Sequence, residues 1–416
     1  MGNANDVLII GGGIIGASAA YWLAEAGARV VLADMGAVGS GCSEANAGFV
    51  APSHSIPLAA PGVVGKALKW MFDPESPFYL KPRPDLSLLA WLWRFRAACS
   101  PERMRRSAAI LYELNAAGRR LYDDLHARDD LSFHLDRSGL LELYATEQGF
   151  QEGAAQAALL RSLGVEAQLL DGAEARAMEP LALPSVVGGI AFPIDAAVDP
   201  AEVVAELIRA TERRGAVVRA HTEVLGFEAG GGRITAVETT RGTFAPDHVV
   251  LAAGAWTARL ARPLGIRLPL QAAKGYSITF PRPEPAPARP LLLQEAKVAV
   301  TPYPSALRFA GTLELAGMEL SIDRRRVDAI TRAVGRYIHR DEAAEPIEIW
   351  RGLRPCTPDG LAYLGRPAAL DNLIIATGHA MKGVCQAPIT GQLVADLICG
   401  RQPTIDLEPL NPNRFL

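Results

Sequence analysis

The chain has 416 residues, of which 49% are hydrophobic and 21% are charged. This length exceeds one ordinary hydrophobic core, so we expect a folded protein of two domains. The 42 basic and 45 acidic side chains give a net charge of −3, which argues against nucleic acid as a partner. The five cysteines form no C-x-x-C pair and the seven histidines no closely spaced pair, so we expect no metal site and a reducing cytoplasm.

Residues 7–34 predict a strand, a glycine turn, a helix and a second strand. Gly11, Gly13 and Gly16 have the G-x-G-x-x-G spacing, in which glycines allow the tight turn, the approach of a pyrophosphate and close helix packing. The helix N-terminus offers N–H groups and the positive end of its dipole to phosphates. Asp34 ends the second strand, where a carboxylate can bind ribose hydroxyls. The segment therefore predicts a dinucleotide-binding βαβ unit, and a glycine turn that binds nothing is the alternative.

The same region contains an uncharged run, residues 7–24, that is close to the length of a membrane span or signal peptide. Glycines interrupt the run, Asp6 precedes it in place of a basic cluster, and no cleavage site follows before Glu25. We therefore expect neither a membrane span nor a signal peptide here.

Small residues and prolines dominate the next segment, residues 36–62. Such a segment is typical of a loop lying against a ligand, because small side chains let backbone N–H groups reach it. The residues that we expect beside a cofactor are Ser43, Asn46, Ala47 and Gly48. An ordinary buried connection is the alternative.

Residues 66–72 and 86–98 are amphipathic segments rich in Trp and Leu, separated by a proline-rich stretch. They either pack in the core or form a patch that docks on a membrane surface or a partner, which the flanking Lys and Arg residues favour. Residues 101–130 then predict one long charged helix.

Strands and helices alternate through the rest of the chain. A helix at 201–214 and a strand at 216–219 lead to a buried strand that ends in Ala253 and Gly254, which returns the chain to the nucleotide. Alternating strands at 271–280 and 298–317, with a helix at 324–339, predict an antiparallel sheet. Residues 372–400 close the chain with a strand, a glycine turn and a helix.

With these pieces placed, the chain resembles the FAD-dependent amine oxidoreductases of the D-amino acid oxidase and glycine oxidase superfamily, and among them the bacterial D-amino acid dehydrogenases. The matching motifs are GGGIIG, SEANAG, APGVVGKALKWMF, QAAKGYSITF, WRGLRPCTPDG and ATGHAMKGV. The resemblance implies FAD as the cofactor. In some relatives a cysteine several residues ahead of T-P-D binds flavin covalently. Cys356 lies directly before that sequence, so we expect non-covalent FAD.

The implied fold class is α/β, of the α+β two-domain type: a Rossmann-type FAD-binding domain and a substrate domain built on an antiparallel sheet. We expect the FAD-binding domain to be discontinuous, with residues 1–85, 190–265 and 345–416, and the substrate domain to comprise residues 86–189 and 266–344. The expected cofactor contacts are Gly11, Gly13, Ile14, Ile15, Gly16, Asp34, Met35, Ser43, Asn46, Ala47, Gly48, Val224, Ala253, Gly254, Gly378, His379, Met381, Lys382, Gly383 and Val384.

The substrate site follows from charge. An amino acid carboxylate needs a guanidinium for bidentate recognition, and Arg354 matches the family motif, with Arg351 as the second candidate. A structural ion pair is the alternative for Arg354. We also expect Tyr276 and Lys274 to bind the substrate, or else to pack in the core.

His379 and Lys382 lie in the glycine turn that precedes the last helix. We expect this helix N-terminus to stabilise negative charge on the reduced flavin, and His379 also to contact the substrate. The alternative for His379 is a residue that only caps the turn. No Asp, Glu or His is required as the base, because solvent can take the amine proton.

The predicted function is oxidative deamination of D-amino acids to 2-oxo acids and ammonia, with hydride transfer from Cα to flavin N5. Electrons then pass to a quinone or another carrier in place of oxygen. Alternatives are a D-hydroxyproline dehydrogenase, a glycine or sarcosine oxidase, and a flavin-binding subunit that needs partner chains. We expect a cytoplasmic protein whose Trp-rich segment is a candidate contact with the inner face of the membrane.

Overall fold

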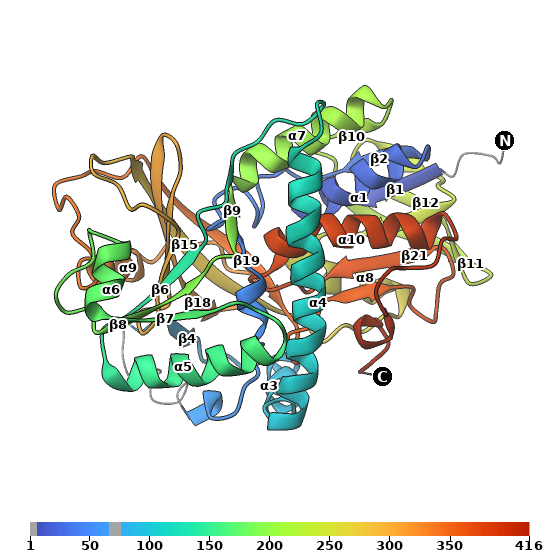
Figure 1. Cartoon of the computed structure of the whole chain (residues 1–416). Helices are drawn as coiled ribbons and strands as arrows, with labels where there is room; N and C mark the ends of the chain where they lie inside the picture. Colours follow the sequence, from blue (N-terminus) through green and yellow to red (C-terminus); the bar gives the residue numbers. More distant parts are fainter. Residues whose placement is uncertain (1–5, 66–75, 416) are drawn as a thin grey trace.

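The computed structural model describes residues 6–65 and 76–415, and two large β-sheets organise them (Figure 1). The first, here called the nucleotide sheet, has the strand order β10-β2-β1-β14-β21-β20. Neighbouring strands are parallel except for the antiparallel pair β20–β21. The strands are β1 (Asp6–Ile10), β2 (Arg29–Ala33), β10 (Val217–Arg219), β14 (His248–Leu251), β20 (Tyr363–Gly365) and β21 (Leu373–Thr377).

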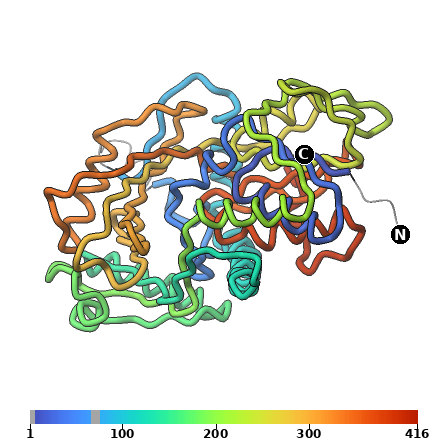
Figure 2. The backbone as a smooth tube through the Cα atoms, turned by 90° about the horizontal axis from the view of Figure 1, so that it is seen from above, coloured from blue at the N-terminus to red at the C-terminus, as the bar shows by residue number. Residues whose placement is uncertain are grey.

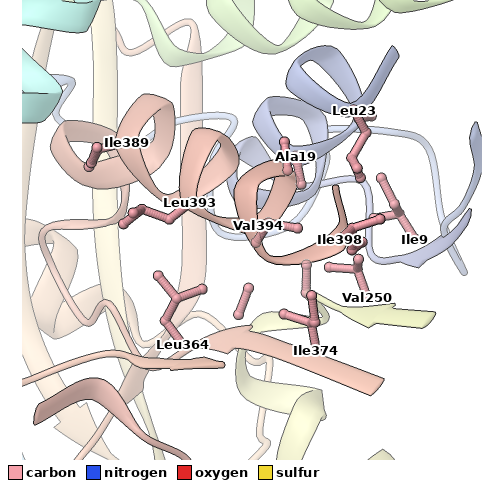
Figure 3. Packing of buried hydrophobic residues seen from close by; sticks show 14 of the residues in the cluster. Ile9, Ala19, Leu23, Val250, Leu364, Ile374, Ile389, Leu393, Val394 and Ile398 are labelled. Atoms are coloured by element: carbon pink, nitrogen blue, oxygen red, sulfur yellow. The ribbon is translucent and has the colours of Figure 1, made fainter. Parts of the chain in front are cut away.

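Helices α1 (Ile14–Glu25) and α10 (Gly383–Ile398) pack together over the nucleotide sheet. Figure 3 shows this packing, in which Leu23 of α1 lies near Ile9 of β1 and Leu393 of α10 lies near Leu364 of β20. The helices approach closely because Gly391 has no side chain: a Cβ there would lie 2.5 Å from the Ser18 carbonyl carbon. Helix α7 (Pro200–Arg213) packs against α1, and α4 (Pro101–His126) packs against α10.

The second sheet, here called the large sheet, has the order β19-β15-β18-β17-β16-β6-β8-β7, with β4 beside β18. Most pairs are antiparallel, whereas β16–β6 and β18–β4 are parallel. Its strands are β4 (Phe78–Leu80), β6 (Leu140–Tyr144), β7 (Gln168–Asp171), β8 (Gly188–Phe192), β15 (Gln271–Pro281), β16 (Leu291–Leu293), β17 (Val298–Pro302), β18 (Ala306–Leu315) and β19 (Glu348–Cys356). In Figure 2 the orange strands of this sheet lie on one side and the red and blue nucleotide sheet on the other.

Helices α5 (Glu147–Ser162), α6 (Gly172–Met178) and α9 (Arg324–Val334) pack against the large sheet. Between them, α9 and β15 bury the apolar core of this half of the molecule. Two small sheets complete the fold: β11 (Val224–Gly230), β12 (Arg233–Thr239) and β13 (Gly242–Phe244), and β3 (Phe49–Val50), β9 (Ala196–Val198) and β5 (Leu135–Asp136). The remaining helices of the described residues are η1 (Pro52–Ser55), α3 (Leu86–Ala98), η2 (Gly254–Trp256), α8 (Thr257–Ala261), η3 (Arg262–Leu264) and η4 (Glu408–Leu410).

The structure corrects the expected domain boundaries at two places. Strand β19 pairs with β15 in the large sheet, although we expected residues 345–416 to belong wholly to the FAD-binding domain. Strand β8, which spans the expected boundary at residue 190, pairs with β6 and β7 in the same sheet. An apolar strand pattern shows that a strand is buried but not which sheet it joins, and for this reason the sequence misplaced both.

The amphipathic segment at 86–98 forms helix α3, and α4 ends at His126, before the expected residue 130. The amphipathic segment expected at 66–72 lies outside the described residues. Within 6–65 and 76–415, no helix is both long and apolar enough to cross a membrane.

Candidate active site

The turn between β1 and α1 requires glycine at two positions. Gly11 has φ +108°, and a Cβ there would lie 2.5 Å from the Ala252 carbonyl oxygen. A Cβ on Gly16 would lie 1.8 Å from the Gly11 carbonyl oxygen. Gly13 is the N-cap of α1, and a Cβ there would meet just the Ser43 hydroxyl, at 3.4 Å. The space in front of the α1 N-terminus is therefore open to a phosphate.

Asp34 follows β2, and its carboxylate is held by backbone. It accepts hydrogen bonds from the N–H of Gly12 (2.6 Å) and of Gly36 (2.8 Å). The Asp34 carbonyl accepts from the Thr222 N–H at 2.7 Å, which brings the start of β11, and with it Val224, beside this strand end. The next residue, Met35, is half exposed. This placement suits an acid that binds ribose.

Ala253 and Gly254 lie at the carboxyl end of the nucleotide sheet. The Ala252 N–H donates to the Ile10 carbonyl (2.8 Å), and the Thr377 hydroxyl donates to the Gly254 carbonyl (2.9 Å). Both residues therefore lie at the same sheet edge as the Gly11 turn.

The loop of residues 43–48 joins the two sheets. The Ser43 hydroxyl accepts from the N–H of Ile14, in the first turn of α1, at 3.0 Å. The side chain of Arg308, on β18, donates through Nη1 to the Asn46 carbonyl at 3.0 Å. The loop is thereby fixed at both ends, and Arg308 is a contact that no sequence motif marks.

Two further contacts hold the end of this loop. The Thr301 hydroxyl donates to the Ala47 carbonyl at 2.7 Å. Gly48 has φ +76°, and a Cβ there would lie 2.0 Å from the Val198 carbonyl oxygen, so no other residue fits. Neither Thr301 nor Val198 belongs to a recognisable motif. In the sequence, Gly48 was the residue that indicated this close packing.

Arg354 on β19 lies across the face of the large sheet. Its guanidinium covers Gly275: a Cβ on that glycine would lie 2.0 Å from Nη1. Nη1 donates to the Thr312 carbonyl at 2.7 Å. Among the described residues no carboxylate lies within ion-pair distance of this half-buried cation, so the ion pair considered for it is not found there. Arg354 retains N–H donors for a carboxylate ligand.

The structure does not bring Tyr276 and Lys274 to Arg354. Successive strand residues point to opposite faces, so both neighbours of Gly275 point away from the guanidinium. The Tyr276 hydroxyl donates to Glu314 (2.8 Å), and Lys274 Nζ donates to the Ser321 carbonyl (2.9 Å). Both are buried on the α9 side. The expectation that they bind the substrate carboxylate beside Arg354 is corrected by this geometry.

The second arginine candidate, Arg351, also points away from the Arg354 face. Its register partner on β15 is Tyr276, and its Nε donates to the Leu320 carbonyl at 2.9 Å. Of the two arginines, the structure therefore leaves Arg354 as the candidate carboxylate ligand.

The glycine turn before α10 lies beside β19. A backbone bridge joins His379 to Cys356. The His379 imidazole is buried and shares a hydrogen bond of 3.0 Å with the Thr390 hydroxyl. Burial lowers the pKa of His379 to about 4, so the ring is neutral at physiological pH. Gly378 has φ +86°, and a Cβ there would lie 2.6 Å from the Thr357 methyl group.

Lys382 ends this turn as the N-cap of α10, followed by Gly383 and buried Val384, whereas Met381 is half exposed. The Lys382 side chain is buried, and burial lowers the pKa of its ammonium to about 8. A cation at a helix N-terminus is unfavourable by itself, so this position suits a place where a bound anion supplies the compensating charge.

Two buried hydroxyls near these elements have no hydrogen-bond partner among the described residues: Ser277 Oγ and Thr357 Oγ1. Ser277 shares the sheet face of Gly275, and Thr357 follows Cys356. Unpaired buried hydroxyls, a solvent-accessible helix N-terminus and an uncompensated lysine all fit a large polar cofactor. The glycine turns at Gly11 and Gly378, with Asp34 and the 43–48 loop, are the residues that would hold it.

A nucleotide sheet with a glycine turn, joined to a sheet that presents an arginine, indicates a dinucleotide-dependent enzyme that acts on an anionic substrate. The chain belongs to the family of FAD dependent oxidoreductases (DAO), which matches residues 6–397. FAD is therefore its cofactor, as the sequence predicted.

Relatives with assigned names match nearly the whole chain. It is 36% identical over 417 residues to the D-amino acid dehydrogenase of Xanthobacter autotrophicus, covering 98% of this chain and 99% of that one. It is 34% identical to the D-amino acid dehydrogenase of Granulibacter bethesdensis, with the same two coverages. Glycine oxidase from Geobacillus kaustophilus has a similar structure, with TM-score 0.81, 26% identity and 99% of each chain covered. L-proline dehydrogenase from P. horikoshii shares the fold, with TM-score 0.79, 19% identity, and 100% of this chain and 98% of that one covered.

Proposed function

We propose that the protein oxidatively deaminates D-amino acids to 2-oxo acids and ammonia, and passes the electrons to an acceptor other than oxygen. The observation that carries this proposal is Arg354, a half-buried guanidinium beside the cofactor cradle with no described carboxylate as partner. Relatives named D-amino acid dehydrogenase over 98% of the chain support the substrate class. The nucleotide sheet would bind FAD and the large sheet the substrate.

Arg354 would bind the substrate carboxylate through two parallel N–H···O bonds, since its plane is already fixed against Gly275. This fixes the orientation of Cα, and positioning of this kind supplies much of the rate enhancement when the protein itself forms no bond. When bound, FAD would supply the hydride acceptor for the Cα–H bond.

The protein's charges suit that step. Lys382 and the α10 N-terminus would stabilise negative charge on the cofactor. His379 is neutral and bonded to Thr390, so it positions the turn and is not expected to act as the base. The substrate ammonium would lose its proton to solvent. Burial raises the pKa of Cys356 to about 12, which leaves an unreactive thiol and supports non-covalent FAD.

Product analysis tests this function. The purified chain, supplied with D-alanine and an artificial electron dye, should form pyruvate and ammonia in equal amounts, one of each per two electrons transferred. D-proline and cis-4-hydroxy-D-proline, assayed in parallel, separate primary from cyclic amines, and sarcosine tests the glycine oxidase alternative. Activity of the single chain would exclude a subunit that needs partners. Faster turnover of the L-enantiomers would refute the proposal.

We further propose that the acceptor is a membrane quinone and that the protein rests on the inner face of the cytoplasmic membrane. Leu86, Leu89 and Trp93 share one face of α3 and are 84%, 60% and 72% exposed. Exposed Arg96 on the same helix suits anionic lipids. The protein should co-sediment with anionic vesicles, and replacing Leu86 with Ser should weaken that binding. Wild-type protein that stays in the supernatant would favour a soluble carrier protein reduced elsewhere on the surface, and unchanged binding by the variant would place the membrane contact on another face.

A further inference from the structure

A cavity of ≈ 350 Å³ lies beneath α3 and is lined almost wholly by apolar side chains. This volume is within the range of about 300–1,000 Å³ that is typical of small-molecule sites. Among the described residues that line it, Arg96 alone carries a charge. The walls comprise Leu58, Val64, Phe78, Leu80, Leu89, Trp91, Leu92, Trp93, Phe95, Leu313, Leu315 and Cys356.

The cavity adjoins Arg354 through β19. Cys356 lines the cavity and lies two residues beyond Arg354 on the same strand, so the two side chains point to one face of the sheet. The cavity thus borders the same sheet face on which the guanidinium lies.

Strand β18 makes the same connection. Leu313 lines the cavity, and it directly follows Thr312, whose carbonyl accepts the hydrogen bond from Arg354. Ala273, which lies opposite Arg354 in the sheet, packs in one apolar cluster with Trp91 and Leu313. Strands β18 and β19 therefore both connect the position of Arg354 to the apolar lining of the cavity.

Resting on the proposed function, we propose that this cavity receives the side chain of the substrate whose carboxylate Arg354 binds. The preferred substrates are then D-amino acids with large aliphatic or aromatic side chains, such as D-leucine and D-phenylalanine. A carboxylate bound at Arg354 leaves the remainder of the substrate beside Cys356 and Leu313. An apolar side chain there is stabilised by leaving water, whereas a polar side chain is destabilised because it loses hydrogen bonds to water. D-alanine reaches the site but fills little of the cavity.

The binding test uses the FAD-loaded protein and carboxylates that lack an amine, so they are not oxidised. Calorimetry compares Kd for 3-phenylpropanoate with Kd for propanoate. From the value of burying one large side chain, 3-phenylpropanoate should bind on the order of 10- to 100-fold more tightly. Leu92→Trp, which fills the cavity, should abolish most of this difference. Ala90→Trp, at an exposed position on α3 outside the cavity, should preserve it.

Leu89→Trp, at the exposed mouth of the cavity, is a second filling variant in case Leu92→Trp does not fold. With the dye assay, either variant should lower kcat/KM for D-phenylalanine at least tenfold while D-alanine changes less than threefold. The proposal is overturned if the wild-type Kd ratio is near one, or if the filling variants leave it unchanged and instead raise KM for a quinone acceptor. If 3-phenylpropanoate binds as expected but no D-amino acid is oxidised, the cavity assignment stands and the proposed function fails.

Discussion

Replacing Arg354 with Met removes the guanidinium while keeping an unbranched side chain over Gly275. In the structure the guanidinium donates one hydrogen bond to the Thr312 carbonyl, at 2.7 Å, out of the five N–H donors that a guanidinium has. Two donors can therefore bind the substrate carboxylate. Each charge-assisted hydrogen bond contributes about 1.5–3 kcal/mol, so losing two should lower kcat/KM for D-amino acids about 100- to 10,000-fold.

Arg351→Met is the matched control. Arg351 lies three residues earlier on the same strand but donates to the Leu320 carbonyl on the opposite face, so its loss should change kcat/KM less than about fivefold. The assay is dye-linked turnover of D-alanine, with the flavin spectrum and Tm confirming that each variant folds and holds FAD. If Arg354→Met retains activity within tenfold of the wild type, or Arg351→Met loses as much, another group binds the carboxylate.

Three further variants test other parts of the account. Gly275→Ala places a Cβ 2.0 Å from the Arg354 guanidinium and should displace it. KM for D-alanine should therefore rise at least tenfold while the flavin spectrum is unchanged. An unaltered KM would contradict the packing of Arg354 on Gly275. Gly16→Ala places a Cβ 1.8 Å from the Gly11 carbonyl, so the purified variant should lose most of its FAD, measured as flavin absorbance per chain. Burial raises the pKa of Asp195 to about 7, so between its ordinary value near 3.9 and pH 7 the folded state holds a proton that the unfolded state lacks. The free energy of unfolding, measured with urea, should therefore fall by about 2 kcal/mol from pH 5 to pH 7. Asp195→Asn should remove that decline. If the free energy of unfolding depends on pH equally in the wild type and the variant, the role given to Asp195 is wrong.

The nucleotide-binding half could be predicted from local sequence. A buried strand, a glycine turn and a terminal acid act within about thirty residues, and the structure has β1, α1 and β2 there with Asp34 at the end. The amphipathic segment at 86–98 forms helix α3, whose start is fixed locally by Asp85, the N-cap that accepts from the Ser87 and Leu88 N–H groups. In these segments the determining interactions are close in sequence.

The substrate half was harder to predict because its contacts are distant in sequence. Strand alternation puts Gly275 and Tyr276 on opposite faces, but it does not say which face meets the cofactor. The glycine in K-G-Y-S was the available signal, since it leaves room for Arg354, 79 residues away. Arg308 reaches the Asn46 carbonyl from 262 residues away and has no motif to mark it.

The most direct test of the central claim is anaerobic reduction of the purified protein's flavin by paired enantiomers of alanine, phenylalanine and proline, followed as loss of the visible absorbance. The D-enantiomers should bleach the flavin, D-phenylalanine fastest, and the L-enantiomers should not. Bleaching by L-amino acids, or a bound flavin that no amino acid reduces, would contradict the assignment of this chain as a D-amino acid dehydrogenase.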